Sequence, residues 1–522
     1  MGAVVGLWAI FISYFSYYFV TYSLNVAQPR IAADLNGMAL YSWMISLPAL
    51  ASAVTVLIFG KLSDLYGRRI ILLIALGFFL VGSILSALSG TMELLIAARV
   101  VLAVGQGALA PLCFAVLGDL YEPAERSKWA GWMNVPAGIT AIIGPTLAGW
   151  MTDRLSWRDV FWIMVPMALV SGVLVWIGVP SPDRPSRRPV DLFGSLLLAL
   201  ASGGLILGFS WGGTLFPWDS IQIIGLLAGS ALLWMAFLWA EGRAAEPMLD
   251  PQVLTNRTFI TAALAALTSF LGLIGIMAYY PLFLQGVQGT SATLSGQIIT
   301  PFGVLMAFTG VPAGLLLART KRYKWMYIGG YGLLTAAMFG MFTFSAATPI
   351  WLGILVTSVA GLGLGTIPTL NTLVAQFALP RRLLGAATGA IFFFVMMGQA
   401  LAPAILGSAM TAAYGPSLQA GLPAGLTGSV DQSTLTALAD PRVLLAPQAM
   451  TALQDKLGGP DAALFQQTTA AVRGALEASL KTVFLIGAAG MMISLLLIIT
   501  IPELSMDAEA ADARLVEPAA AD

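Results

Sequence analysis

The chain has 522 residues, of which 58% are hydrophobic and 10% are charged, and its mean hydropathy is +0.87. This balance is far from that of a soluble domain and predicts an integral membrane protein. Its 25 basic and 25 acidic residues cancel, which gives no support for nucleic-acid binding. With no histidine and one cysteine, Cys113, the sequence lacks histidine triads, intramolecular disulfides and cysteine metal clusters. We therefore expect no enzyme, no metal site and no cofactor.

Apolar runs of about 20 residues, the length that crosses a bilayer as a helix, recur along the chain. They lack the alternation of barrel strands, so we predict an all-α membrane protein with fourteen transmembrane helices. In chain order, the runs cover residues 5–28, 42–60, 70–89, 94–117, 129–150, 159–179, 192–212, 221–240, 258–284, 296–318, 325–345, 350–373, 384–409 and 481–501. The first has no basic n-region or cleavage site, so we interpret it as a retained span.

The basic residues predict the orientation of these spans. Most of them fall in one alternate set of connecting loops, for example Lys61, Arg68, Lys321 and Arg322. The positive-inside rule places those loops in the cytoplasm. An even number of spans then places both termini there, in a plasma (inner) membrane protein.

The proline-rich basic stretch at 180–191 indicates a division of the chain. We predict an N-terminal six-helix bundle at 1–180, a linker with two extra transmembrane helices at 181–257, and a C-terminal six-helix bundle at 258–522. The last includes an outward loop at 410–480, in which "PQAMTALQDKL" and "DAALFQQTTAAVRGALEASL" have helical spacing.

The segment "GKLSDLYGRR" at residues 60–69 joins two predicted spans with almost no loop. Gly60 and Gly67 permit a tight turn and close backbone approach, while Asp64, Arg68 and Arg69 can form charge-assisted contacts. The segment is interpreted as a latch on the cytoplasmic face. The alternative is an ordinary basic loop.

This segment resembles the signature loop of the major facilitator superfamily, and several others resemble its fourteen-helix drug:proton antiporter branch. Trp43 lies seventeen residues before Gly60, as in that branch, and "YYPLFLQGVQGTSATLSGQIITP" at 279–301 resembles the branch's ninth-helix region. The resemblance implies alternating access, proton antiport and multidrug export, with a lipid bilayer, small molecules and protons as partners. A weak internal repeat, in which "GLLLARTKRYK" at 314–324 resembles "GKLSDLYGRRI" at 60–70, fits two bundles with a substrate site between them.

The fifth predicted span resembles the exporter-type pattern G-x8-G-x3-G-P-x2-G-G. Thr140 and Ala148 replace two of its glycines. The residues that match are Gly131, Gly144, Pro145 and Gly149. Small residues and a Gly-Pro bend suit a helix about which two halves rock, and the alternative is an ordinary glycine-rich packing face.

Arg99 is the one ionisable residue well inside a predicted span. Such a residue is a functional candidate, since a buried charge is costly in a membrane. It resembles the family's fourth-helix arginine, which is implicated in coupling. Leu102 and Ala103 stand where the family has Gln-Gly, and Gln106 follows one turn later. The alternative is a structural arginine bonded to backbone carbonyls.

The first predicted span carries uncharged polar residues within one narrow stripe, at 100° per residue. They are Tyr14, Tyr18, Thr21, Asn25 and Gln28. We predict that the stripe faces a substrate cavity, which polar residues of other spans complete; the alternative is hydrogen bonding between helices. Those other residues are Arg99, Asn134, Tyr279, Tyr280, Gln285, Asn371 and Gln399.

The branch places an aspartate nine residues before the proline that ends this stripe, and here Val20 stands in that place. No acid lies deep in a predicted span, so coupling to protons would use Asp34, Glu93, Asp119 or Arg99. We predict a proton-linked exporter of amphipathic small molecules. The alternatives are a proton-independent facilitator or exporter of neutral, anionic or lipid-like solutes, and a membrane receptor or scaffold.

Overall fold

The computed structural model describes residues 2–35, 40–180, 192–213, 216–243, 251–290, 292–380, 383–423, 438, 454 and 462–503. Within these residues the regular structure is helical, apart from one isolated β-bridge between Gly212 and Phe216. The predicted all-α class is confirmed for this part of the chain. Every predicted apolar run falls on helical structure.

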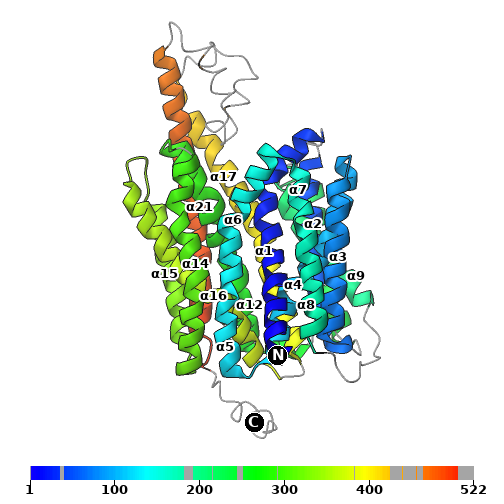
Figure 1. The fold of residues 1–522 in the computed structure, drawn as a ribbon. Helices are drawn as coiled ribbons and strands as arrows, with labels where there is room; N and C mark the ends of the chain where they lie inside the picture. Colours follow the sequence, from blue (N-terminus) through cyan, green and yellow to red (C-terminus); the bar gives the residue numbers. More distant parts are fainter. Residues whose placement is uncertain are drawn as a thin grey trace.

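The N-terminal half is a bundle in which α1 packs on α4, α6 and α8, while α4 packs on α2 and α3 (Figure 1). Its helices are α1 (Gly2–Asp34), α2 (Tyr41–Tyr66), α3 (Arg68–Leu88), α4 (Met92–Leu120), α5 (Pro123–Trp132), α6 (Asn134–Arg154), α7 (Trp157–Trp162) and α8 (Met164–Gly178). The end at which α1 begins and α2 ends carries Lys61, Arg68 and Arg126, and we call it the basic end.

The C-terminal half is a second bundle, in which α21 packs on α12, α15 and α17, and α16 packs on α14 and α15 (Figure 1). Its segments are α11 (Pro251–Thr255), α12 (Arg257–Ile274), η2 (Gly275–Tyr279), α13 (Tyr280–Leu282), η3 (Phe283–Val287), α14 (Ala292–Thr320), α15 (Lys324–Phe342), α16 (Ile350–Phe377), α17 (Leu384–Gly421) and α21 (Ala462–Ile499).

Two further helices, α9 (Leu192–Trp211) and α10 (Ile221–Glu241), lie between the halves in the sequence. They pack on each other, and α9 also packs on α2 and α17. Trp234 of α10 also lies against Phe393 of α17, with ring centroids 5.8 Å apart, so α9 contacts both bundles and α10 contacts the C-terminal one. Its first residues, 181–191, lie outside the described residues, as do the side chains of Asn25 and Pro145.

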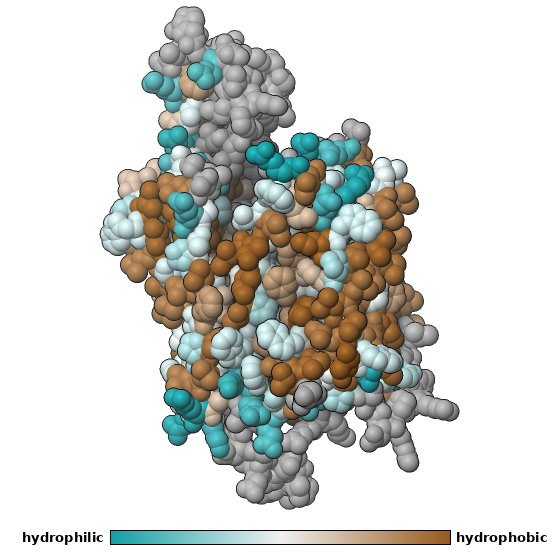
Figure 2. Space-filling view, in the orientation of Figure 1, coloured by the Kyte–Doolittle hydropathy of each residue, from teal (hydrophilic) through white to brown (hydrophobic). Residues whose placement is uncertain are grey.

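Eleven helical segments of the described chain are long and apolar enough to cross a membrane, and Phe193–Phe209 is a shorter apolar helix. The predicted runs at 129–150 and 325–345 are helical without reaching that hydropathy. Glycine, proline and threonine lower the mean hydropathy of the first run, and glycines and tyrosines lower that of the second. Brown, hydrophobic residues dominate the middle of the molecule, with teal, hydrophilic residues gathered toward both ends (Figure 2).

Prolines account for two interruptions that the hydropathy pattern did not predict. The run at 129–150 divides into α5 and α6 at Met133, and the run at 159–179 divides into α7 and α8 at Ile163. Pro136 and Pro166 each follow the last residue of the first helix by four positions. Since proline has no N–H, the carbonyls of Trp132 and Trp162 lose their helical partners there.

The last long connection is more helical than a loop. α17 continues to Gly421 and α21 begins at Ala462, so both extend into the predicted outward loop at 410–480. The expected helix in "DAALFQQTTAAVRGALEASL" is confirmed, whereas "PQAMTALQDKL" lies mostly outside the described residues. The first turns of α21 rise beyond the end of the bundle opposite the basic end (Figure 1).

Close packing of α3 on α4 depends on glycine. A Cβ atom added at Gly82 of α3 would overlap the backbone of Leu102 on α4, whereas one added at Gly77 of α3 would meet nothing within 4 Å. The two glycines therefore offer a matched comparison on a single helix.

We expect Gly82→Ala to destabilise the protein by about 1–3 kcal/mol, the usual cost of overpacking, because α3 and α4 must move apart. Thermal unfolding of the purified protein in one detergent measures the effect. Gly77→Ala is the control and should unfold at the wild-type temperature or slightly above it. Equal unfolding temperatures for all three proteins would contradict this description of the packing.

Candidate functional site

Two glycine-lined contacts join the halves at the basic end. In the first, Gly60 of α2 faces Gly389 of α17, and an added Cβ at Gly60 would lie 3.3 Å from the Cα of Gly389. In the second, a Cβ at Gly131 of α5 would overlap the carbonyl oxygen of Gly310 on α14, and Gly314 lies against the same segment. Of the residues predicted to gate the protein, Gly60 and Gly131 thus lie between the halves.

Neutral hydrogen bonds cross the second contact. Asn134 Nδ2 donates to Thr369 Oγ1 at 2.9 Å and to the Gly365 carbonyl at 3.2 Å, both on α16. Thr369 in turn donates to the carbonyl of Ala130 at 3.2 Å. Asn134, predicted to line a cavity, is buried here in the interface between the halves. Its position beside Gly310 explains why that residue is a glycine.

A buried arginine adds a third contact that the sequence did not single out. Arg126 of α5 donates to the Gly118 carbonyl at 2.9 Å and to Gln376 Oε1 of α16 at 3.3 Å. Gln376 also donates to Thr388 of α17 at 3.0 Å. In the sequence, Arg126 lies in the short polar segment "YEPAERSKWAG" between two apolar runs, where a basic residue indicates only which side of the membrane the loop faces.

The predicted latch is a charged cluster beside these contacts. Arg68 lies 2.5 Å from Asp64 and 3.0 Å from Asp119 of α4, so it ties α2, α3 and α4 together. Gly67 is the single residue between α2 and α3 and has a φ of 95°, which glycine adopts without strain. Asp64 also accepts a hydrogen bond from the backbone of Ala386 on α17. The cluster therefore reaches across to the C-terminal half.

The polar stripe of α1 lies in an aromatic cluster where the halves meet. Tyr14 packs edge-on against Tyr18, with ring centroids 5.0 Å apart, and against Phe114 of α4 at 5.5 Å. Phe114 approaches Phe392 of α17 at 5.7 Å, and the Tyr17 hydroxyl donates to the sulfur of Met396. Both halves thus contribute to a cluster that lies at the middle of α1 and has hydroxyl groups but no charge among these residues.

Gln106 joins this cluster, although it was not among the predicted cavity residues. It lies at the midpoint of α4 and donates to Thr21 Oγ1 at 3.0 Å and to the Tyr17 carbonyl at 3.3 Å. The sequence contained a signal, because Gln106 follows the family's glutamine position by one turn. The stripe of α1 and the centre of α4 therefore form one polar site.

Arg99 lies elsewhere, about 10 Å along α4 from the end opposite the basic end. Its side chain is buried, and Nη1 donates to the Met44 carbonyl of α2 at 3.0 Å. A bond to a backbone carbonyl is what the interpretation of Arg99 as a structural residue predicts.

The C-terminal residues predicted to line the cavity are dispersed. Tyr279 donates to the Pro403 carbonyl at 3.3 Å, Tyr280 is buried beside Gly353, and Asn371 accepts a hydrogen bond from Tyr327 within the same half. Gln285 and Gln399 are half-buried. The prediction that these residues share one cavity with the α1 stripe stays a prediction.

The remaining candidates have the following positions and partners. Asp34 pairs with Arg30 at 3.2 Å on the exposed surface, and Glu93 is exposed in the first turn of α4. The Gly144 carbonyl accepts a hydrogen bond from Ser23 of α1 at 3.3 Å. Gly149 is half-buried on α6, Gln28 is buried, and Arg69 stacks on Trp176, with 4.2 Å from Cζ to the ring centroid.

Known protein sequences resemble this chain over most of its length. The family model described as Major Facilitator Superfamily matches residues 10–403. The chain is 35% identical over 384 residues to "Uncharacterized MFS-type transporter Rv1877" of Mycobacterium tuberculosis, an alignment that covers 73% of this chain and 56% of the relative. The chain thus spans little more than half of that relative's length. "Multidrug transporter protein MdtP" of Bacillus subtilis is 30% identical over 392 residues, covering 75% of this chain and 72% of the relative.

Solved structures share the fold. The proton:xylose symporter XylE bound to 6-bromo-6-deoxy-D-glucose has a TM-score of 0.61 at 14% identity, with 99% of each chain covered. The human organic anion transporter MFSD10 (TETRAN) has a TM-score of 0.55 at 15% identity, with 94% of this chain and 98% of that chain covered. At these identities the likeness concerns the fold alone.

The uncharged hydrogen bonds of Asn134 should stabilise the closed form of the basic end. Asn134→Ala should shift the equilibrium between the closed and the open basic end toward the open form by about 1 kcal/mol, roughly fivefold. The reason is that the bonds to Gly365 and Thr369 are lost. The measurement is maleimide labelling of Ser127→Cys, a fully buried position on α5. The native Cys113 is buried and should not react.

Thr140→Ala is the matched control. Thr140 is also buried on α6, but its hydroxyl donates only within that helix, to Pro136 and Ala137, among the bonds described. Labelling should rise in the Asn134 variant and stay at the reference rate in the Thr140 variant. Equal rates in both variants would show that the Asn134 bonds do not hold the halves together.

Proposed function

Because the chain belongs to the major facilitator superfamily, and is therefore a membrane transporter rather than an enzyme, we propose that it exports amphipathic small molecules by alternating access. The family resemblance seen in the sequence is confirmed. A transporter of this family acts on small molecules from within a membrane, so its partners are a substrate and a bilayer.

The contacts at the basic end support the alternating-access part of the proposal. Glycine contacts, the Asn134 bonds and the Arg126–Gln376 bond all join the halves there. In the proposed orientation, this end and both termini face the cytoplasm, across a plasma membrane that the chain crosses fourteen times. The structure then corresponds to a state closed toward the cytoplasm, and rocking of the halves would open it.

The observation that carries the substrate class is the uncharged polar site. Tyr14, Tyr18, Thr21 and Gln106 offer ring faces, hydroxyl groups and an amide near the middle of α1 and α4. Aromatic and amide groups suit a solute with an apolar body and a few polar atoms. The name of MdtP, a multidrug transporter, supports drug-like solutes as substrates, and we extend that activity to this chain as part of the proposal.

Proton coupling is part of the proposal and would act at the ends of the helices. Asp64 and Asp119 lie at the basic end, and Asp34 and Glu93 at the other. The same placement favours the second candidate, a facilitator or exporter that needs no proton, because a proton carrier usually lies near the substrate path. The third alternative, a receptor or scaffold, is set aside because the chain belongs to a family of transporters.

Transport in proteoliposomes tests these proposals. We expect neutral amphipathic dyes to move at least several-fold faster than permanently cationic dyes, because no carboxylate lies in the described polar site to replace a cation's hydration. An imposed pH gradient should accelerate movement if protons are coupled. An unchanged rate after collapse of the gradient selects the proton-independent alternative.

Gln106→Leu should raise KM for a neutral dye several-fold, because a half-buried polar partner of Thr21 and of the substrate is lost. Turnover at saturating dye should change less. The control is Gln297→Leu on α14, where the glutamine is exposed. If both variants show the wild-type KM, the polar site does not bind substrate.

A further inference from the structure

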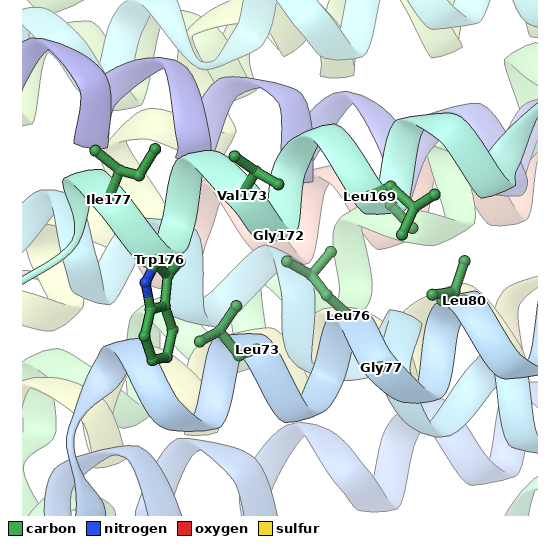
Figure 3. A pocket seen from close by; sticks show the side chains of 10 residues that line it. Leu73, Leu76, Gly77, Leu80, Leu169, Gly172, Val173, Trp176 and Ile177 are labelled. Atoms are coloured by element: carbon green, nitrogen blue, oxygen red, sulfur yellow. The ribbon is translucent and has the colours of Figure 1, made fainter.

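An apolar groove runs along the outer surface between α3 and α8, with a volume of about 370 Å³. Leu73, Leu76 and Leu80 of α3 form one wall, and Leu169, Val173 and Trp176 of α8 form the other (Figure 3). Both helices lie in segments apolar and long enough to cross a membrane. The groove is therefore open to lipid rather than to water.

Two glycines give the groove its depth. Gly77 of α3 and Gly172 of α8 both line it, and a Cβ added to either residue would meet nothing within 4 Å. This differs from Gly82, further along α3, where the neighbouring helix fills the space. Leu76 and Ala168 are buried, whereas Leu169 and Val173 are more than half exposed. A flexible hydrocarbon chain matches a narrow, smooth, apolar groove of this kind.

A cationic group stands at one end of the groove. The Arg69 guanidinium stacks on the Trp176 ring, with 4.2 Å from Cζ to the ring centroid. A guanidinium held by its face still presents N–H donors along its edge, in a geometry that suits phosphate. Arg69 lies one helical turn before Leu73, so the cation lies next to the apolar groove on the same face of α3. A tryptophan near the basic end is also typical of the depth at which lipid headgroups lie.

We propose that this groove binds one acyl chain of an anionic phospholipid, whose phosphate contacts Arg69. From Leu73 to Leu80 the groove is roughly 10 Å long, which accommodates the upper part of a single chain. The second chain stays in the bilayer. The site is separate from the polar site between the halves, and the proposal does not depend on which solute is transported.

Native mass spectrometry of the purified protein tests the proposal, with phosphatidylglycerol and phosphatidylcholine of the same chain length as probes. We expect the wild type to retain one phosphatidylglycerol at least fivefold more tightly than one phosphatidylcholine. Gly172→Leu should fill the groove and remove this first binding event for both lipids. Arg69→Gln should keep one lipid but lose the preference for phosphatidylglycerol.

Gly229→Leu on α10 is the matched control, since an added Cβ there also meets nothing within 4 Å. It should bind lipid as the wild type does. Gly77→Leu, on the facing wall, provides a second variant if Gly172→Leu does not fold. Wild-type retention in the folded groove variants, or equal loss in Gly229→Leu, would overturn the proposal. So would loss of a dimer instead of a lipid, because the groove would then bind a second copy of the chain.

Discussion

The close approach of backbones at the basic end is the constraint on which the rest of the structure depends. Gly60 faces Gly389, and Gly131 faces Gly310, with no room for a side chain at Gly131. In a membrane, helices gain little from hydrophobic association, so close packing of small residues supplies much of the attraction. Such contacts are smooth and leave no side chain without a partner when they separate. The halves can therefore be held together and still come apart.

This arrangement assigns different chemistry to different depths of the molecule. At the basic end, glycine packing is reinforced by polar side chains that bond across the interface, among them Asn134 and Arg126. At mid-depth the halves meet through rings, where Phe114 approaches Phe392 and Tyr17 approaches Met396. Rings and a thioether adapt their packing at small cost. A solute that enters among these side chains would displace the ring and thioether contacts. The glycine packing and hydrogen bonds at the basic end would stay in place.

Hydropathy and motif spacing predicted helical structure in the apolar runs, the turn at Gly67 and the charged residues of the latch, because each is a local property of the chain. Gly67 could be assigned to a turn from its place between two apolar runs. The hydrogen-bond partners of Asn134 and Arg126 on α16 could not be predicted, because they lie more than 200 residues away in the sequence. The same limit explains Arg99, whose burial was evident from the sequence while its bond to the Met44 carbonyl depended on how α2 packs.

Val20 lies apart from the polar stripe of α1. Val20 lies about 120° around α1 from Tyr14, off the polar stripe, and it is almost fully buried. An acid there would not have faced Gln106, so its replacement by valine leaves the polar site intact. By contrast, Asp64 binds Arg68 within its own half and accepts a hydrogen bond from Ala386 of the other. A change in its charge would therefore alter one contact inside the N-terminal half and one that crosses to the C-terminal half.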